Sequence, residues 1–259
     1  MTKSNDSDDV QRVEIPREQL SQTSLEREAS RLTHREEIIS VIAHDLRNPL
    51  SCISLNASLI LQDISSVDLD RTRDRIKAIQ RRCDEMTRLI SSLLDAEFIT
   101  AGKMPVNMRN ADVCEDVHTT VNDFLPLAEH KGIYFECHTP EHPCMVKCDP
   151  SRICQVMSNL VSNAIKYAPN DTIVKVKLTQ QDEDVLFTIE SPGPVIAPEN
   201  REAVFDRYVR LEYNAQQIAE SRGLGLWISR WIVTQHGGKI WVEPTPGADG
   251  NIFKFTLPR

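Results

Sequence analysis

Glycine is absent from the first hundred residues of this 259-residue chain, in which Gly102 is the first glycine and Pro16 and Pro49 are the only earlier prolines. Because glycine and proline interrupt regular structure most strongly, this part of the chain can be mostly helical. A long apolar run is also absent. The longest stretch without a charge, Asn48 to Gln62, is too short to span a membrane. The N-terminus, MTKSNDSDDV, lacks the apolar core of a signal peptide. We therefore expect no membrane insertion by this chain.

Paired cysteines are lacking as well. The seven cysteines are odd in number and contain no CxxC spacing, which argues against a disulfide scaffold and favours a reduced, cytoplasmic setting. Basic residues are outnumbered, with 30 Lys and Arg against 38 Asp and Glu, so the net charge is −8. An acidic balance argues against nucleic acid or an anionic membrane as the main partner. Apolar residues form 40% of the chain, which suits one or two folded domains.

Two apolar stripes run along the glycine-free part. The first is a heptad pattern with one charged position at Glu36 (Leu25, Leu32, Ile39, Leu46, Ile53 and Ile60, each followed four residues later by Ala29, Glu36, Ala43, Leu50, Ala57 and Ile64). A turn is predicted at 65–68, and the second stripe follows it (Ile76, Ile79, Cys83, Met86, Ile90 and Leu93). The pattern predicts a disordered segment over 1–16 and a coiled-coil lead-in with an antiparallel helical hairpin over 17–101. Two hairpins closing into a four-helix bundle would cover both stripes, so we predict a homodimer.

The texture of the sequence changes near residues 101–105. All nine glycines and all but two of the 14 prolines lie beyond this point. Alternating apolar runs predict strands at 133–138, 173–178, 185–190, 239–243 and 252–257. Helical periodicity predicts helices over 112–130, 149–168 and 224–236. Strands mixed with helices predict an α+β layer domain over 104–259.

The first segment that could carry chemistry is HDLRNPL at 44–50. If Leu46 is a core position of the first stripe, His44 points to solvent, with Asp45 beside it and Asn48 one turn further on. An exposed imidazole whose Nδ1 proton is held by a carboxylate is a workable nucleophile at Nε2. The alternative is a solvated surface histidine beside a surface acid.

Two further segments could bind a nucleotide. Asn159, Asn163 and Lys166 share one face of a predicted helix and are followed by Tyr167. Amide oxygens can ligate Mg²⁺, lysine can meet phosphate charge, and tyrosine can stack on a base. Gly223 and Gly225 form a glycine-rich turn before another predicted helix, where free N–H groups can bind phosphate. The alternatives are a polar stripe that faces water and a helix start packed closely on a strand.

Together these segments resemble the catalytic core of sensor histidine kinases. HDLRNPL is similar to their H box, NLVSNAIKYAP to the N box, Val204 to Tyr208 to the F box, and GLGLWI with HGGKIWVE to the G2 box and the strand after it. The four motifs keep the family order and spacing and span about residues 30 to 259. The resemblance implies a dimeric phosphoacceptor hairpin followed by a Bergerat-type α/β sandwich that binds ATP.

The resemblance also implies a reaction and its residues. The γ-phosphoryl group of ATP would move to His44 and then to an aspartate of a response-regulator receiver domain. Asp45 would handle the imidazole proton, and Asn48 with Asp45 would match a motif for dephosphorylating the regulator. Asn163 would ligate Mg²⁺. Arg207 and residues 208–222 would form a lid, and the other nucleotide contacts would come from Asn159, Lys166, Tyr167, Ser191, Gly193, Arg222, Gly223 and Gly225.

The G1 box departs from the family form D-x-G-x-G. Ser191 stands where the resemblance expects the adenine-binding aspartate, and Val195 replaces the second glycine around Gly193. Glu190 is adjacent, but neighbouring residues of a strand point to opposite faces. Losing a charge-assisted hydrogen bond costs about 1.5–3 kcal/mol. Ser221 also replaces the first glycine of the G2 box. The nucleotide site is thus partly eroded beside complete H and N boxes.

Three functions fit this mixture. The first is an active histidine kinase with weakened adenine recognition, which the retained Asn159, Asn163 and Lys166 favour. The second is a histidine phosphotransfer protein or phosphatase with a degenerate ATP-binding domain, and the third is a catalytically silent dimeric scaffold. The residues before the H box are too few for a sensor domain, so we expect either input from an upstream cytosolic sensor protein or a chain that is part of a longer protein.

Overall fold

The computed structural model describes residues 46, 48–61, 69–211, 223–247 and 249–259. Its contacts divide the chain into two compact units, residues 1–86 and 87–259. His44, Asp45, Arg222 and the predicted turn at 65–68 lie outside the described residues, as does nearly all of the predicted coiled-coil lead-in. None of the described helices is long and apolar enough to cross a membrane.

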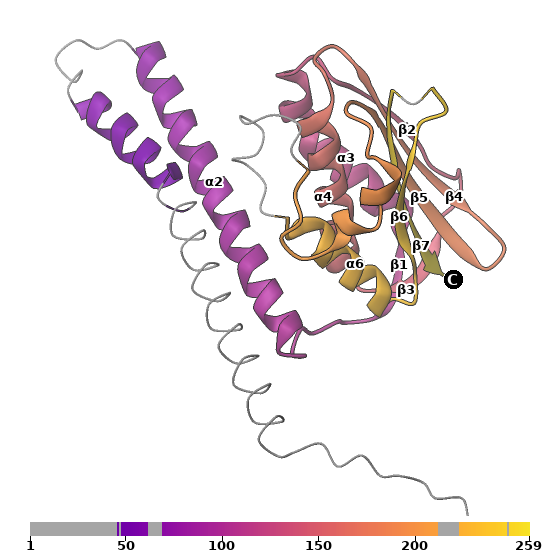
Figure 1. The fold of residues 1–259 in the computed structure, drawn as a ribbon. Coiled ribbons are helices and arrows are strands. Elements are labelled where there is room, and N and C mark those ends of the chain that lie inside the picture. Colours follow the sequence, from indigo (N-terminus) through magenta and orange to yellow (C-terminus); the bar gives the residue numbers. More distant parts are fainter. Residues whose placement is uncertain (1–45, 47, 62–68, 212–222, 248) are drawn as a thin grey trace, which may run out of the picture. The chain divides into compact units, whose positions relative to one another are not determined.

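Two helices make up the described part of the first unit. Residues 48–61 are helical, and α2 (Leu69–Thr100) begins in this unit and ends in the second (Figure 1). The guanidinium of Arg75 donates a hydrogen bond to the carbonyl oxygen of Leu59 at 2.9 Å. This bond joins the start of α2 to the end of the preceding helix, as the predicted antiparallel hairpin requires.

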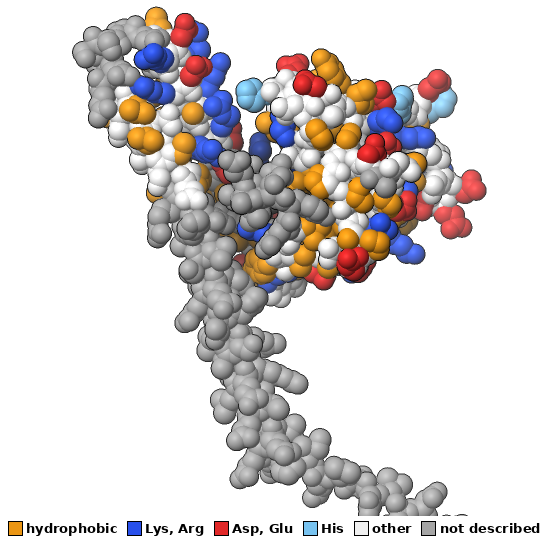
Figure 2. All heavy atoms as spheres, turned by 45° about the horizontal axis from the view of Figure 1, so that its top comes forward, with side chains coloured by type: hydrophobic (Ala, Val, Ile, Leu, Met, Phe, Trp, Pro, Cys, Tyr) orange, Lys and Arg blue, Asp and Glu red, His pale blue; other side chains and the backbone are white. Residues whose placement is uncertain are grey.

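Large apolar side chains lie on the surface of this hairpin (Figure 2). Leu50 of the first predicted stripe is 53% exposed, and Ile76 of the second predicted stripe is 46% exposed. A single hairpin cannot cover both stripes, because each helix has one side turned to its neighbour and another turned to solvent. The exposed side chains therefore agree with the reason for expecting a homodimer.

The second unit is built on a five-stranded sheet in the order β2–β4–β5–β7–β6. β2 and β4 pair in parallel, and every other neighbouring pair is antiparallel. The strands are β2 (Tyr134–His138), β4 (Ile173–Gln180), β5 (Asp184–Pro192), β6 (Ile240–Pro244) and β7 (Gly250–Pro258). One face of the sheet is covered by α3 (Val113–Glu129), α4 (Pro150–Tyr167) and α6 (Gly225–Gln235) (Figure 1). The predicted α+β layer fold is confirmed, with these elements close to their predicted bounds.

The core of this unit lies between the sheet and the three helices. Every second residue of β5 is buried, so Phe187 and Ile189 point toward the helices. The ring of Phe187 stacks on that of Phe255 from β7, with ring centroids 4.9 Å apart. Apolar residues of α4 fill the space above the sheet (Ile153, Val156, Met157, Leu160, Val161, Ala164 and Ile165). This packing fixes the rotation of α4 about its axis, and with it the direction of the helix's polar residues.

Four short elements were not predicted from the sequence. β1 (Arg109–Asp112) and β3 (Met145–Cys148) form a separate two-stranded antiparallel sheet. Two single 3₁₀ turns follow β5: η2 (Pro198–Asn200) and η3 (Ala203–Phe205), the second of which includes the first two F-box residues. Each of these elements has only three or four residues, too few for a periodic pattern to stand out.

Candidate functional site

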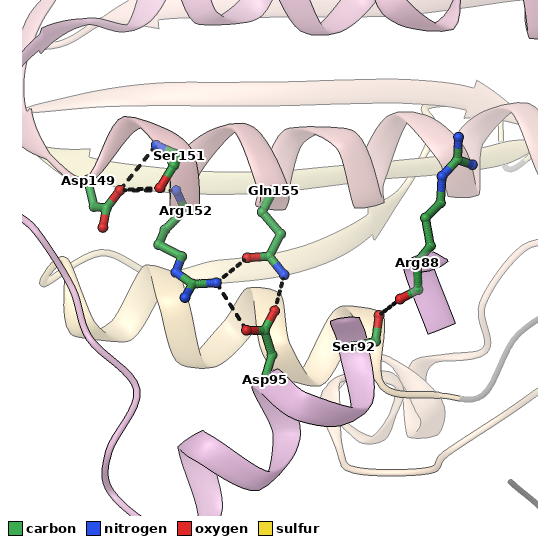
Figure 3. Close-up of polar contacts among 7 residues, drawn as sticks. All are labelled: Arg88, Ser92, Asp95, Asp149, Ser151, Arg152 and Gln155. Carbon is green, nitrogen blue, oxygen red and sulfur yellow. Dashed lines mark hydrogen bonds and ion pairs between the residues drawn. The ribbon is translucent and has the colours of Figure 1, made fainter. Parts of the chain in front are cut away.

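Helix α4 carries four of the predicted nucleotide-binding residues. Asp149 begins the helix, because its carboxylate accepts hydrogen bonds from the backbone N–H groups of Ser151 and Arg152 (Figure 3). Burial opposes the ionisation of Asp149, but these bonds and one from the backbone of Asn107 outweigh it and lower the pKa of the carboxyl. The polar residues Asn159, Asn163, Lys166 and Tyr167 lie half-buried beside the core stripe.

Asn159 joins α4 to the start of α6. Its amide Nδ2 donates a hydrogen bond to the hydroxyl of Ser229 at 3.0 Å. One turn earlier in α6, a Cβ atom at Gly225 would collide with the amide oxygen of Asn159. A side chain at position 225 would therefore have to displace the amide of Asn159, and the N-box and G2 segments, 66 residues apart in sequence, meet at this point.

The first turn of α6 has backbone N–H groups without a partner inside the helix. The first N–H groups of a helix have no partner within it, and Leu224 at the start of α6 supplies no side-chain hydrogen bond to them. Gly223, which precedes it, has a φ of +64° and lies so close to Tyr208 and Val209 that a Cβ atom would clash with their backbone. Such a glycine turn before a helix is a suitable site for phosphate oxygens.

The G1 segment leaves β5 beside these helices. Ser191 is buried and points to the same face as Phe187 and Ile189, toward the helices. Gly193 has a φ of +142°, and a Cβ atom there would lie 2.7 Å from the carbonyl oxygen of Tyr167, so this segment packs on the end of α4. Asn251 of β7 holds the segment by bonds to the backbone of Pro194 and Ile196 at 2.7 and 2.9 Å.

Glu190 faces away from this site. Its carboxylate pairs with Lys175 of β4 at 3.2 Å on the opposite face of the sheet. The alternation of strand residues predicted this orientation. Glu190 therefore does not restore the carboxylate that Ser191 lacks, and the serine hydroxyl is the polar group that β5 supplies at the expected base position.

Arg207 lies near the first turn of α6 but bonds to α2. Its guanidinium stacks on the rings of Tyr208 and Trp227, with 4.8 and 5.2 Å to the ring centroids. The same group donates to the hydroxyl of Thr100 at 3.3 Å and pairs with Glu97 at 3.4 Å. The structure thus brings Arg207 beside the start of α6 and pairs it with one carboxylate and one hydroxyl of α2.

The end of α2 is held to α4 by a second, more buried cluster (Figure 3). The carboxylate of Asp95 pairs with Arg152 at 3.1 Å and accepts a hydrogen bond from Gln155 at 2.7 Å. Arg152 and Gln155 also bond to each other at 3.0 Å, which closes a triangle. Ala96 and Ile99 of the same turns are buried in the core of the second unit. The last turns of α2 are therefore part of the unit that carries the candidate site.

Sequence reasoning missed several residues that shape the site. Lys131 donates to the carbonyl oxygens of Ile165 and Lys166 at 2.8 and 3.1 Å and so caps the end of α4. Ser229 and Asn251 were also missed, as was Asp95. Asn251 carried a usable signal, since a polar residue on the core side of an alternating strand needs a hydrogen-bonding partner. Lys131 lies in a turn and carried none.

The predicted phosphoacceptor segment is described only in part. Asn48 is exposed on the first helix of the hairpin, and Pro49 beside it is buried. His44 and Asp45 lie outside the described residues, so their pairing remains a prediction. Asn163 makes no side-chain hydrogen bond in the described part of the chain, which leaves its amide oxygen open to a ligand.

Two family models match the chain. Residues 34–102 match the His Kinase A phospho-acceptor domain, and residues 148–259 match the histidine kinase-, DNA gyrase B- and HSP90-like ATPase domain. The first match spans the hairpin and the second spans α4, the G1 segment and α6.

Individual relatives match nearly the whole chain. Over 254 residues the chain is 33% identical to the sensor protein KdpD of Clostridium acetobutylicum, covering 95% of this chain and 27% of that protein. Over 255 residues it is 33% identical to the adaptive-response sensory kinase SasA of Thermosynechococcus vestitus, covering 93% and 65%. A crystal structure of histidine kinase ThkA in complex with response regulator protein TrrA matches 93% of this chain and 66% of that chain, with a TM-score of 0.58 and 26% identity. The chain spans less than two thirds of the length of each of these relatives.

Proposed function

Because this chain belongs to the sensor histidine kinases and carries their catalytic core, we propose that it phosphorylates its own His44 from ATP. We propose further that the phosphoryl group passes to an aspartate of a response-regulator receiver domain. The observation that carries the proposal is the junction of α4 and α6. There Asn159 bonds to Ser229, and its amide oxygen lies where a Cβ atom at position 225 would have to displace it. That junction joins the two segments expected to hold the nucleotide.

The proposed transfer uses the imidazole as nucleophile. Nε2 of His44 attacks the terminal phosphorus of ATP, and the new N–P bond forms as the P–O bond to ADP breaks. Asp45 keeps the proton on Nδ1, so Nε2 carries the attacking electron pair. The N–P bond then breaks as an aspartate oxygen of the regulator takes the phosphoryl group. We propose that Asn48, which is exposed on the hairpin, orients a water for regulator dephosphorylation.

The residues at the junction suit a magnesium–triphosphate group. The open amide oxygen of Asn163 is a ligand type that Mg²⁺ accepts, and a magnesium ion there would offset the charge of the phosphate oxygens. The first turn of α6 supplies backbone donors to those oxygens. Lys166 and Arg207 add positive charge, while Gly223 allows the turn to approach closely.

The base pocket gives a reason to keep a second candidate. Ser191 supplies a hydroxyl where a carboxylate would bind adenine, and Glu190 is turned to the other face of the sheet. If the loss of this contact abolishes ATP binding, the chain acts as a histidine phosphotransfer protein or regulator phosphatase, with a silent dimeric scaffold as the remaining possibility. The retained α4–α6 junction favours the kinase.

Three partners follow from the proposal. The similarity to ThkA in its complex with TrrA supports a receiver domain that docks on the hairpin. The match to the phospho-acceptor domain and the exposed apolar stripe support a second copy of the chain as the bundle partner. An upstream sensor protein that acts on the segment before His44 is the third proposed partner.

Incubation of the protein with Mg²⁺ and γ-labelled ATP tests the proposal. We expect an acid-labile, base-stable label that His44→Gln removes and that His34→Gln, a second histidine of the same segment, leaves in place. Acceptance of phosphoryl from a phosphorylated regulator, without labelling by ATP, would establish the phosphotransfer alternative. If neither ATP nor a phosphorylated regulator labels the protein, the silent dimeric scaffold is the function that still fits.

A further inference from the structure

Arg207 lies between two groups that can accept hydrogen bonds from its guanidinium, a carboxylate on α2 and the proposed phosphate site on α6. On one side are Glu97 and Thr100 in the last turn of α2, at 3.4 and 3.3 Å from its guanidinium. On the other side is the ring of Trp227, which belongs to the first turn of α6. That turn is the proposed phosphate site, so the following inference rests on the proposed function.

The contact between Arg207 and α2 is weak by its geometry. Glu97 is 75% exposed, and both distances are long for charge-assisted hydrogen bonds. In addition, Nε of Arg207 is buried without a hydrogen-bond partner in the described part of the chain. An exposed ion pair contributes little, and an unsatisfied buried donor costs free energy. The present position of Arg207 is therefore one that a better anion can replace.

The neighbouring Asp95 cluster differs in each of these respects. Its carboxylate and guanidinium are only 13% and 21% exposed, and Asp95, Arg152 and Gln155 all bond to one another. The same turns of α2 thus make one durable contact with α4 and one exchangeable contact with Arg207. Exchange of Arg207 would leave the end of α2 in place.

We propose that Glu97 and Thr100 are positioning residues that hold Arg207 on α2 and compete with the phosphate groups of the nucleotide for it. In the free protein Arg207 pairs with Glu97. When nucleotide binds at the first turn of α6, the guanidinium moves to a phosphate oxygen and Glu97 is released to solvent. Because coupling is reciprocal, whatever weakens the contact on α2 strengthens nucleotide binding, and bound nucleotide weakens the contact.

Calorimetric titration with magnesium and the non-hydrolysable analogue AMPPNP tests this competition. We expect Glu97→Gln to bind the analogue about two- to fivefold more tightly, the range set by an exposed ion pair. Thr100→Val, which changes no charge, should tighten binding in the same direction. Glu202→Gln is the matched control, because it removes an equally exposed carboxylate that pairs with Arg230 instead.

The Arg207→Ala background separates competition from a general effect of charge. In that background Glu97→Gln should no longer change the affinity for AMPPNP, because the guanidinium for which Glu97 and the phosphate groups compete has been removed. An unchanged affinity of Glu97→Gln, or the same gain with and without Arg207, overturns the competition while the proposed kinase stands. If the unsubstituted protein binds no analogue at all, the proposed kinase fails and the competition fails with it.

Discussion

At the scale of single residues, the base pocket depends on which side of β5 each side chain faces. Ser191 points toward the helices and Glu190 points away, where Lys175 neutralises it. Strand β5 therefore supplies no carboxylate to the expected base position, even though Glu190 is the neighbouring residue along the chain. A hydroxyl can accept a hydrogen bond from an amino group but brings no charge to it.

Ser191→Asp should restore the missing charge. We expect ATP to bind about ten- to 150-fold more tightly, since a charge-assisted bond contributes about 1.5–3 kcal/mol. Ser191→Asn, which has the same shape as aspartate without its charge, is the control and should gain much less. Because position 191 is buried, the aspartate should also lower the melting temperature of the free protein. Calorimetric titration of both variants would contradict the account of the G1 box if aspartate binds no better than asparagine.

The charge of Asp149 should appear in the pH dependence of stability. Hydrogen bonds to its carboxylate outweigh burial and hold its pKa below the usual value. Its contribution is therefore complete above the unfolded pKa of about 4 and is lost as the pH falls through the lower folded pKa. Asn can still cap a helix, so Asp149→Asn isolates the charge.

Urea unfolding of the two proteins at several pH values measures this contribution. At pH 7 we expect Asp149→Asn to be less stable by about 1 kcal/mol, with a difference that shrinks below about pH 4. A difference that stays constant down to pH 3 would show that the carboxylate charge has no part in starting α4.

At the scale of elements, α2 is one continuous helix that serves two units. Its first half forms the hairpin, and its last turns are buried against α4 through Ala96, Ile99 and the Asp95 cluster. A rotation of α2 therefore acts on α4, the helix that carries Asn159 and Asn163. The coupling between hairpin and nucleotide site is thus expected to pass through side chains as well as through the connecting segment.

A double-mutant cycle measures the strength of the Asp95 cluster. We expect Asp95→Asn and Arg152→Gln each to lower the free energy of unfolding by about 1–3 kcal/mol, with a coupling energy above about 1 kcal/mol. The pair Arg82 and Glu85 on α2 is more exposed and should show a coupling below about 1 kcal/mol. Equal coupling in the two cycles would mean that the Asp95 cluster is an ordinary surface ion pair.

The elements were largely predictable, and their long-range contacts were not. Alternating residues in β5 and the apolar stripe of α4 depend on local sequence, so strands, helices and the direction of Glu190 followed from the pattern. The Asn159–Ser229 bond and the place of Gly225 required the packing of two helices far apart in sequence. Arg207 was expected over a nucleotide, but nothing in its neighbours predicted Glu97 and Thr100 as partners.

At the scale of the whole molecule, the exposed apolar stripe of the hairpin predicts dimerisation. Ile76→Glu places a charge in that stripe and should shift the protein toward monomer in analytical ultracentrifugation. Lys77→Glu, at the next position and outside the stripe, should leave the dimer intact. The far-ultraviolet circular dichroism of both variants should stay close to that of the parent, because the ATP-binding unit has its own core. Monomers in the parent protein at micromolar concentration would contradict the predicted four-helix bundle.

The central claim is that ATP bound at the α4–α6 junction phosphorylates His44 of the hairpin. Peptide mapping by mass spectrometry after incubation with Mg²⁺ and ATP tests it most directly. We expect one acid-labile phosphoryl group on the peptide that contains His44, and none when Asn163→Ala removes the proposed magnesium ligand. An unmodified His44 peptide after incubation of the folded, dimeric protein with saturating ATP, or a phosphoryl group on another residue, would contradict the claim.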